Sequence, residues 1–69
     1  MKVSARNLLT GTITHIVRGP VSTEVTLRIG PGVEVVSVIT SSSARRLKLK
    51  KGSKAHAMIK ADSVILAVD

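Results

Sequence analysis

The sequence lacks cysteine, phenylalanine, tyrosine and tryptophan altogether. Without cysteine the chain forms neither a disulfide nor a thiolate metal site. Ordering 69 residues costs on the order of 100 kcal/mol, and only aliphatic burial is available to offset that cost. Subunit association is the remaining common way to stabilise so small a scaffold. We therefore expect a homo-oligomer.

Acidic residues are scarce: there are four Asp and Glu against eleven Lys and Arg, a formal net charge of +7. This excess indicates an anionic partner. The two histidines, His15 and His56, fall inside predicted strands, and the acids are scattered. Such a set provides neither a nucleophile with its base nor chelate spacing for a metal ion. We predict a protein that is not an enzyme, with no bound metal ion and no organic cofactor.

Long apolar runs are also missing, since none approaches the roughly 18 residues of a membrane span. Polar residues 4–7 follow Met1, Lys2 and Val3, so no apolar signal core is present. We expect a cytoplasmic protein with no membrane partner. The positive mean hydropathy and the many β-branched residues exclude disorder. The absence of repeats and linkers predicts a single domain over residues 1–69.

Aliphatic and polar residues alternate as they do in strands. The clearest case is Val21–Ile29, whose odd-numbered residues are predicted to face the core. Gly30, Pro31 and Gly32 predict a turn, and Val33–Thr40 follows as a second strand. The second half of that strand is apolar on both faces, which predicts that it is covered on each side.

The remaining segments complete the predicted fold. Gly11–Val17 reads as a strand before the hairpin, and Ala55–Lys60 and Val64–Val68 read as two strands after it. Between them, Ser41–Ser43 offers capping hydroxyls ahead of a short helix over Ala44–Leu47. This order predicts an all-β fold: a small five-stranded OB-like Greek-key barrel with one short helix and a partly open edge.

Three polar segments could hold a small oxyanion. The first segment, Thr40 with Ser41–Ser43, combines hydroxyls with unpaired N–H groups at a helix start. The second, residues 4–7, supplies a hydroxyl, a guanidinium and an amide. The third is Lys60, which follows a strand directly at a turn. Each also has a structural interpretation: a helix cap, a solvated N-terminal arm and a strand-end lysine. The lysines of residues 48–54 similarly fit a solvated face or a surface that steers anions.

Taken together, the segments resemble a known family. Ser4-Ala5-Arg6-Asn7 opens the chain, the strand Val35–Thr40 leads into the short helix, and Ile59-Lys60-Ala61-Asp62-Ser63-Val64 comes near the end. In these features the sequence resembles the molbindins, small molybdate-binding proteins built from one Mop or TOBE module, over essentially all 69 residues. Leu8-Leu9-Thr10 departs from the family, many of whose members carry polar residues there.

The resemblance implies a hexamer, arranged as a trimer of dimers, that binds molybdate or tungstate reversibly at subunit interfaces for molybdenum storage and homeostasis. Residues of one subunit would face residues of another across each site. The implied oxyanion-binding residues are Ser4 and Arg6 of one subunit and Thr40, Ser42, Ser43, Lys60 and Ala61 of the other. Such a shell contains donors only and therefore disfavours protonated oxyanions such as phosphate. The family also has a second anion site, for which residues 18–22 are a candidate, although a plain hairpin turn explains them better.

The alternative from a different class is an OB-like module that binds single-stranded nucleic acid, which the high positive charge would suit. Such modules usually stack bases on aromatic side chains, and this sequence has none. A third alternative is a regulatory or accessory role, because in the family the same module is also fused to molybdate-responsive regulators and to the ATPase subunits of oxyanion importers. This sequence shows neither a helix-turn-helix nor a P-loop pattern. Storage of the anion is therefore the simpler expectation.

Overall fold

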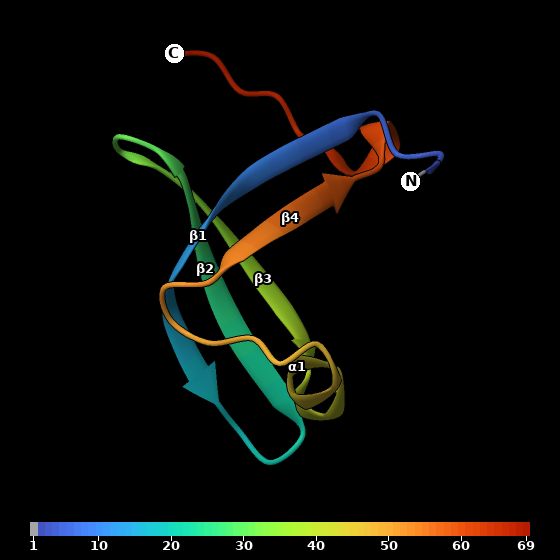
Figure 1. The fold of residues 1–69 in the computed structure, drawn as a ribbon. Coiled ribbons are helices and arrows are strands. Elements are labelled where there is room, and N and C mark those ends of the chain that lie inside the picture. The colour runs from blue at the N-terminus through green and yellow to red at the C-terminus, as the bar shows by residue number, and fades with distance from the viewer. Residues whose placement is uncertain (1) are drawn as a thin grey trace.

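The computed structural model describes residues 2–69. Its elements are four strands, one α-helix and one turn of 3₁₀ helix (Figure 1). In chain order they are β1 (Asn7–Arg18), β2 (Ser22–Gly30), β3 (Val33–Thr40), α1 (Ser41–Arg46), β4 (Lys54–Ile59) and η1 (Ala61–Ser63). The predicted all-β class with one short helix is confirmed.

The four strands form one curled antiparallel sheet in the order β3-β2-β1-β4. Consecutive hairpins join β1, β2 and β3, and the chain then returns through α1 to place β4 beside β1 (Figure 1). A fourth strand that returns to lie beside the first is the Greek-key arrangement. The turn predicted between β2 and β3 is present, with Gly32 at φ 70°.

The core lies on the inner face of the curled sheet. Ile13, Val25 and Leu27 are buried there, and Thr23 lies on the same face of β2. The alternation predicted for β2 is therefore confirmed. Partly buried aliphatic residues from the other elements surround this cluster: Ile16, Ile29, Ile39, Leu49, Ala55 and Ala57.

The predicted fifth strand is not confirmed in the single chain. Residues 64–68 pair with no strand in the described part of the chain and run away from the sheet after η1 (Figure 1). Ile65, Leu66 and Val68 are each about nine-tenths exposed or more. Apolar alternation favours extended backbone, but a strand also needs a neighbour for its N–H and C=O groups. Within one chain this segment has none.

The outer face of β3 also differs from its prediction. Val36 and Val38 are exposed, at 59% and 65%, although the sequence predicts a strand covered on both sides. The inner residues Val35 and Ile39 are half-buried, as expected. The outer valines are exposed because none of the elements described over residues 2–69 packs on this face of β3.

Strand β1 starts at Asn7, four residues before its predicted start at Gly11, because its first half pairs with β4 and its second half with β2. A bulge between Ile13 and His15 adds to its bend. At Gly11 the backbone of β2 comes so close that an added Cβ would collide with the carbonyl oxygen of Arg28. Glycine is therefore required where β1 passes from one partner strand to the other.

Candidate oxyanion site

The first group of predicted site residues lies where β3 passes into α1. Thr40 has extended backbone and is the N-cap of the helix, so its Oγ1 accepts a hydrogen bond of 3.1 Å from the Ser43 N–H. The Thr40 hydroxyl also donates to Ser43 Oγ at 2.7 Å and lies 3.3 Å from Ser42 Oγ. Three hydroxyls are thus gathered at one end of the sheet, and we call Thr40, Ser42 and Ser43 the hydroxyl group.

The helix begins earlier than the sequence predicts. Ser41–Ser43 forms its first turn instead of preceding it, and the capping side chain is Thr40. Ser41 differs from its neighbours because it is buried, at 4% exposure. Its hydroxyl donates to the Gly19 carbonyl at 2.7 Å and bonds Thr23 Oγ1 at 2.7 Å. Ser41 is therefore a structural residue, whereas Ser42 and Ser43 remain accessible.

The second group forms where β1 starts and β4 ends. Asn7 pairs with Ile59, and its Nδ2 donates to the Ile59 carbonyl at 3.1 Å. Arg6 directly precedes this pair and Lys60 directly follows it, so the pairing brings the two cations to the same end of the sheet.

Two further predicted residues belong to this end. Ala61 is the first residue of η1, where its N–H has no intrahelical acceptor, and exposed Ser4 lies just before Arg6. We call Ser4, Arg6, Lys60 and Ala61 the cationic end.

The two groups lie at opposite ends of the sheet. Strand β1 is 12 residues long, which at about 3.3 Å per residue corresponds to roughly 35–40 Å along its curved path. The hydroxyl group lies near the C-terminal end of β1 and the cationic end at its N-terminal end, as Figure 1 shows. One chain therefore does not bring all seven predicted residues into one shell.

Other chemistry is sparse among the described residues. No group of three or more His, Cys, Asp and Glu able to hold a metal ion occurs in residues 2–69. As predicted, His15 and His56 are exposed strand residues; their Nδ1 atoms bond Thr14 Oγ1 at 3.0 Å and Thr10 Oγ1 at 2.8 Å. Nor does any described helix have the length and apolar character to cross a membrane.

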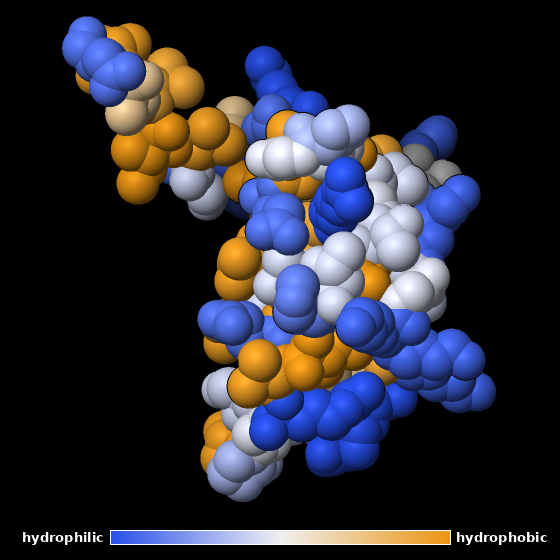
Figure 2. Space-filling view, turned by 90° about the vertical axis from the view of Figure 1, so that its left-hand side faces the viewer, coloured by the Kyte–Doolittle hydropathy of each residue, from blue (hydrophilic) through white to orange (hydrophobic). Residues whose placement is uncertain are grey.

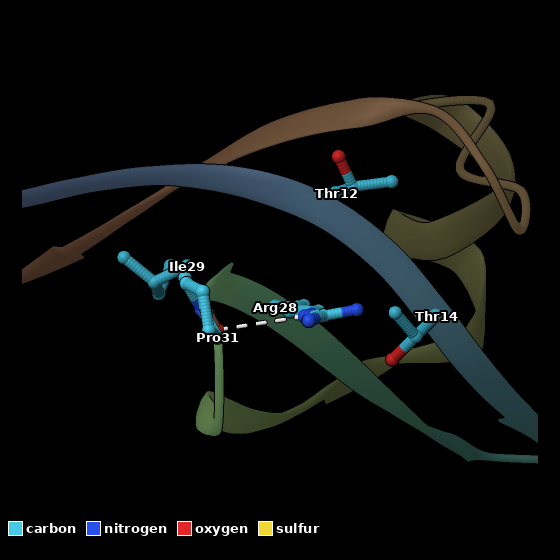
Figure 3. Close-up of a pocket in the computed structure, with 6 residues that line it drawn as sticks. Thr12, Thr14, Arg28, Ile29 and Pro31 are labelled. Atoms are coloured by element: carbon cyan, nitrogen blue, oxygen red, sulfur yellow. Dashed lines mark hydrogen bonds between the residues drawn. The ribbon is translucent and has the colours of Figure 1, made fainter.

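Sequence reasoning misses two hollows in the surface. The larger, about 650 Å³, is apolar and lies over the core between β3 and β4, where the predicted barrel would close. The smaller, about 390 Å³, is lined by Thr12, Thr14, Arg28 and the turn after β2 (Figure 3).

The smaller hollow offers an oxyanion little. The Arg28 Nε donates to the Gly30 carbonyl at 3.5 Å, and Glu34 stands beside Arg28 in the register of β2 and β3. A carboxylate at that position opposes a bound anion. The two groups above are thus the better oxyanion candidates.

Comparison with known proteins gives a consistent result. The TOBE domain family model matches residues 3–66. The chain is 48% identical over its whole length to the molybdenum transport protein ModE of Herbaspirillum seropedicae, of which it spans only 26%. It is 39% identical to the probable molybdenum-pterin-binding protein of Haemophilus influenzae, and the match covers all of both chains. The molybdate-bound structure of the cytoplasmic molybdate-binding protein ModG superposes with a TM-score of 0.94 at 46% identity, covering all of this chain and 49% of that one.

Proposed function

This chain belongs to the TOBE domain family, and from that premise we propose that it binds molybdate reversibly as a non-enzymatic oxyanion-binding protein. The likeness to molybdate-bound ModG, at 46% identity over the whole chain, carries the proposal. The chain spans about a quarter of ModE from Herbaspirillum seropedicae. We also propose that it serves the storage and homeostasis of molybdenum in the cytoplasm. Tungstate, a tetrahedral dianion of the same charge, is the second proposed ligand.

The donors at the two groups suit such an anion. Arg6 and Lys60 supply positive charge, and charge-assisted hydrogen bonds are about twice as strong as neutral ones. The hydroxyl group adds directional donors, and the backbone N–H of Ala61 is a donor that cannot titrate. Because Arg6, Lys60 and the Ala61 N–H can donate but not accept, they favour a fully deprotonated dianion over one that carries a proton.

We place the site between subunits. The hydroxyl group and the cationic end lie at opposite ends of β1 in one chain, so a shell that uses both takes them from different copies. The sequence resemblance assigns Lys60 and Ala61 to the same subunit as Thr40. Arg6 and Lys60 of one chain flank the Asn7–Ile59 pair at the same end of the sheet, which supports our proposal that Lys60 acts with Arg6 of its own chain.

The exposed apolar surface supports association with further copies. Residues 64–68 project from the body with their aliphatic side chains uncovered (Figure 2). The apolar hollow between β3 and β4 is open, and Val36 and Val38 are bare on the outer face of β3. Contiguous exposed apolar surface on a small protein marks an interaction site. The proposed assembly is a homo-hexamer built as a trimer of dimers.

Isothermal titration calorimetry tests the function, once light scattering has fixed the oligomeric state. The expected result is saturable binding of molybdate and tungstate to an oligomer, with neither sulfate nor phosphate in excess displacing them. Equal binding of all four anions would reduce the site to a non-specific basic surface. No molybdate binding by a well-folded oligomer would overturn the proposal.

A further inference from the structure

The cations of this protein are concentrated in one segment. Six of the eleven Lys and Arg lie in residues 45–54, and no acid occurs anywhere in residues 35–61. All six side chains are exposed. Figure 2 shows strongly hydrophilic side chains gathered at the lower right of the face, below and beside a band of hydrophobic ones. We call this segment the cationic loop; its charged residues are Arg45, Arg46, Lys48, Lys50, Lys51 and Lys54.

The cationic loop is hydrogen-bonded to the sheet. Its backbone bonds β1 twice at the bulge: the Ile13 N–H donates to the Ser53 carbonyl at 2.9 Å and the Gly52 N–H donates to the Ile13 carbonyl at 2.8 Å. Ser53 closes the turn by donating through Oγ to the Lys50 carbonyl at 2.6 Å. Its charges therefore project from a fixed backbone, which reduces the entropy lost when a partner binds.

Arg18 extends the charged surface from β1. One of its Nη atoms donates to the Leu49 carbonyl at 3.0 Å, which holds the guanidinium against the cationic loop. Leu49 itself turns inward and packs on the core. The cationic loop and Arg18 together present seven cations and no aromatic side chain.

Lys48 occupies a backbone conformation that is unfavourable for a lysine. Its φ is +54°, the left-handed region, where it ends the helix with its N–H donating to the Arg45 carbonyl at 3.0 Å. Glycine is the residue that adopts this conformation without penalty, and it is the usual choice after a helix. A strained position occupied by a long cation is an observation that points toward function.

The chemistry of the loop selects the partner. Protein interfaces are depleted in lysine and enriched in aromatic residues, and proteins that bind single strands stack bases on aromatic rings. Four of the six cations are lysines, and aromatic residues are absent. Lysine and arginine on a fixed surface suit the closely spaced phosphates of a duplex, which need charge and no stacking.

We propose that the cationic loop, together with Arg18, binds double-stranded nucleic acid through its phosphates without reading base sequence. This activity is separate from the proposed oxyanion binding, because none of the cations used belongs to the hydroxyl group or the cationic end. Its affinity depends steeply on salt, since each phosphate neutralised releases condensed counterions.

Fluorescence anisotropy of a labelled 20-base-pair duplex, titrated with the full chain between about 20 and 200 mM NaCl, tests the proposal. If four to six phosphates are contacted, the logarithm of the association constant falls with the logarithm of salt concentration at a slope of roughly −4 to −5. Changing the base sequence leaves the affinity within about twofold. No binding at 50 mM NaCl, or a strong preference for one sequence, would overturn the proposal.

A matched pair of variants separates the loop from net charge. K50Q/K51Q and K2Q/R28Q each remove two exposed cations, but only the first pair lies in the cationic loop. K50Q/K51Q is expected to lower the magnitude of the salt slope by about two and to weaken duplex binding at least tenfold at low salt. K2Q/R28Q should change affinity less than threefold. Equal losses in both variants would mean that overall charge alone attracts the duplex.

Two other polyanions, a single strand and an anionic membrane, are compared with the duplex. A 20-nucleotide thymidine strand should bind more weakly than the duplex, and vesicles containing 30% phosphatidylserine should not compete with the duplex at equal charge concentration. Tighter binding to the single strand or to the vesicles would overturn the duplex assignment. Molybdate calorimetry on K50Q/K51Q reports the oxyanion site separately, so failure of one function is distinguishable from failure of the other.

Discussion

Thr23 and Ser41 share a hydrogen bond of 2.7 Å between two buried hydroxyls. Ser41 uses its single hydroxyl hydrogen on the Gly19 carbonyl at 2.7 Å, so Thr23 must be the donor in the bond between them. The chain of bonds ties the start of β2 to the start of α1 and to the turn after β1. It fixes the position from which the Thr40, Ser42 and Ser43 hydroxyls project.

The direction of these bonds predicts unequal effects of two substitutions. Ser41→Ala removes the acceptor of Thr23 and the donor to Gly19, and should lower the free energy of unfolding by about 1–3 kcal/mol. Thr23→Val keeps the shape and the Ser41–Gly19 bond, and should cost only about 1 kcal/mol. Urea denaturation at one protein concentration measures both. Equal costs, or a larger cost for Thr23→Val, would contradict the assigned direction.

The close approach at Gly11 predicts a severe effect of a single methyl group. Gly11→Ala would place its Cβ against the carbonyl oxygen of Arg28, so the backbones of β1 and β2 must separate, at a cost of about 2–4 kcal/mol. Gly30→Ala is the control, because a Cβ there meets no atom within 4 Å. Thermal unfolding of the two variants should differ clearly. Similar melting temperatures would show that the sheet absorbs the added atom.

Thr40 has both a capping and a proposed binding role, and two substitutions separate them. Thr40→Val removes the acceptor of the Ser43 N–H and should destabilise the fold by about 1 kcal/mol, while also weakening molybdate binding. Thr40→Ser keeps the hydroxyl and should preserve both properties. Calorimetry combined with urea denaturation reports the two effects separately. Loss of stability with unchanged molybdate affinity in Thr40→Val would restrict Thr40 to capping.

Arg6 is expected to contribute charge-assisted bonds to the bound anion. Arg6→Gln should weaken molybdate binding by about 10–150-fold, the equivalent of 1.5–3 kcal/mol. Arg28→Gln removes the same charge from an exposed position outside the proposed site and should leave affinity within about twofold. Calorimetric titration of both proteins makes the comparison. Equal affinities in the two variants would remove Arg6 from the site.

Lys60 provides a further test at the cationic end. Lys60→Met keeps most of the side-chain volume but removes the charge, so molybdate affinity should fall at least tenfold while the fold is retained. Lys54→Met, at the other end of β4, is the matched control and should bind molybdate normally. Circular dichroism checks the fold and calorimetry the binding. An unfolded Lys60→Met protein would instead assign this lysine a structural role.

Local pattern was sufficient to predict the β2–β3 hairpin. The alternation of β2 and the Gly-Pro-Gly turn are properties of neighbouring residues, and both strands were predicted to within one residue at each end. The early start of β1 depends on pairing with β4, about fifty residues away, which no local pattern contains. For residues 64–68, alternation predicted a backbone conformation but could not provide a partner strand.

The candidate site was also predicted only in part. Residue types alone indicated donors for an oxyanion, and the family resemblance selected Arg6 and Lys60 among the eleven cations. The helix cap was misassigned because Thr40 continues the strand pattern of β3. That Lys60 lies beside Arg6, at the far end of the sheet from Thr40, follows from strand register. Register is set by the whole sheet and cannot be read from the separate segments.

The uncovered segment 64–68 has a consequence for how the protein behaves on dilution. Ile65, Leu66 and Val68 are almost fully exposed in one chain, and β3 and β4 are the edge strands of the sheet. A lone copy is therefore the form most prone to aggregation and to cleavage at its C-terminal end. If copies cover these surfaces for one another, mass action raises the melting temperature with protein concentration. The concentration at which copies separate then sets the lifetime of the folded protein.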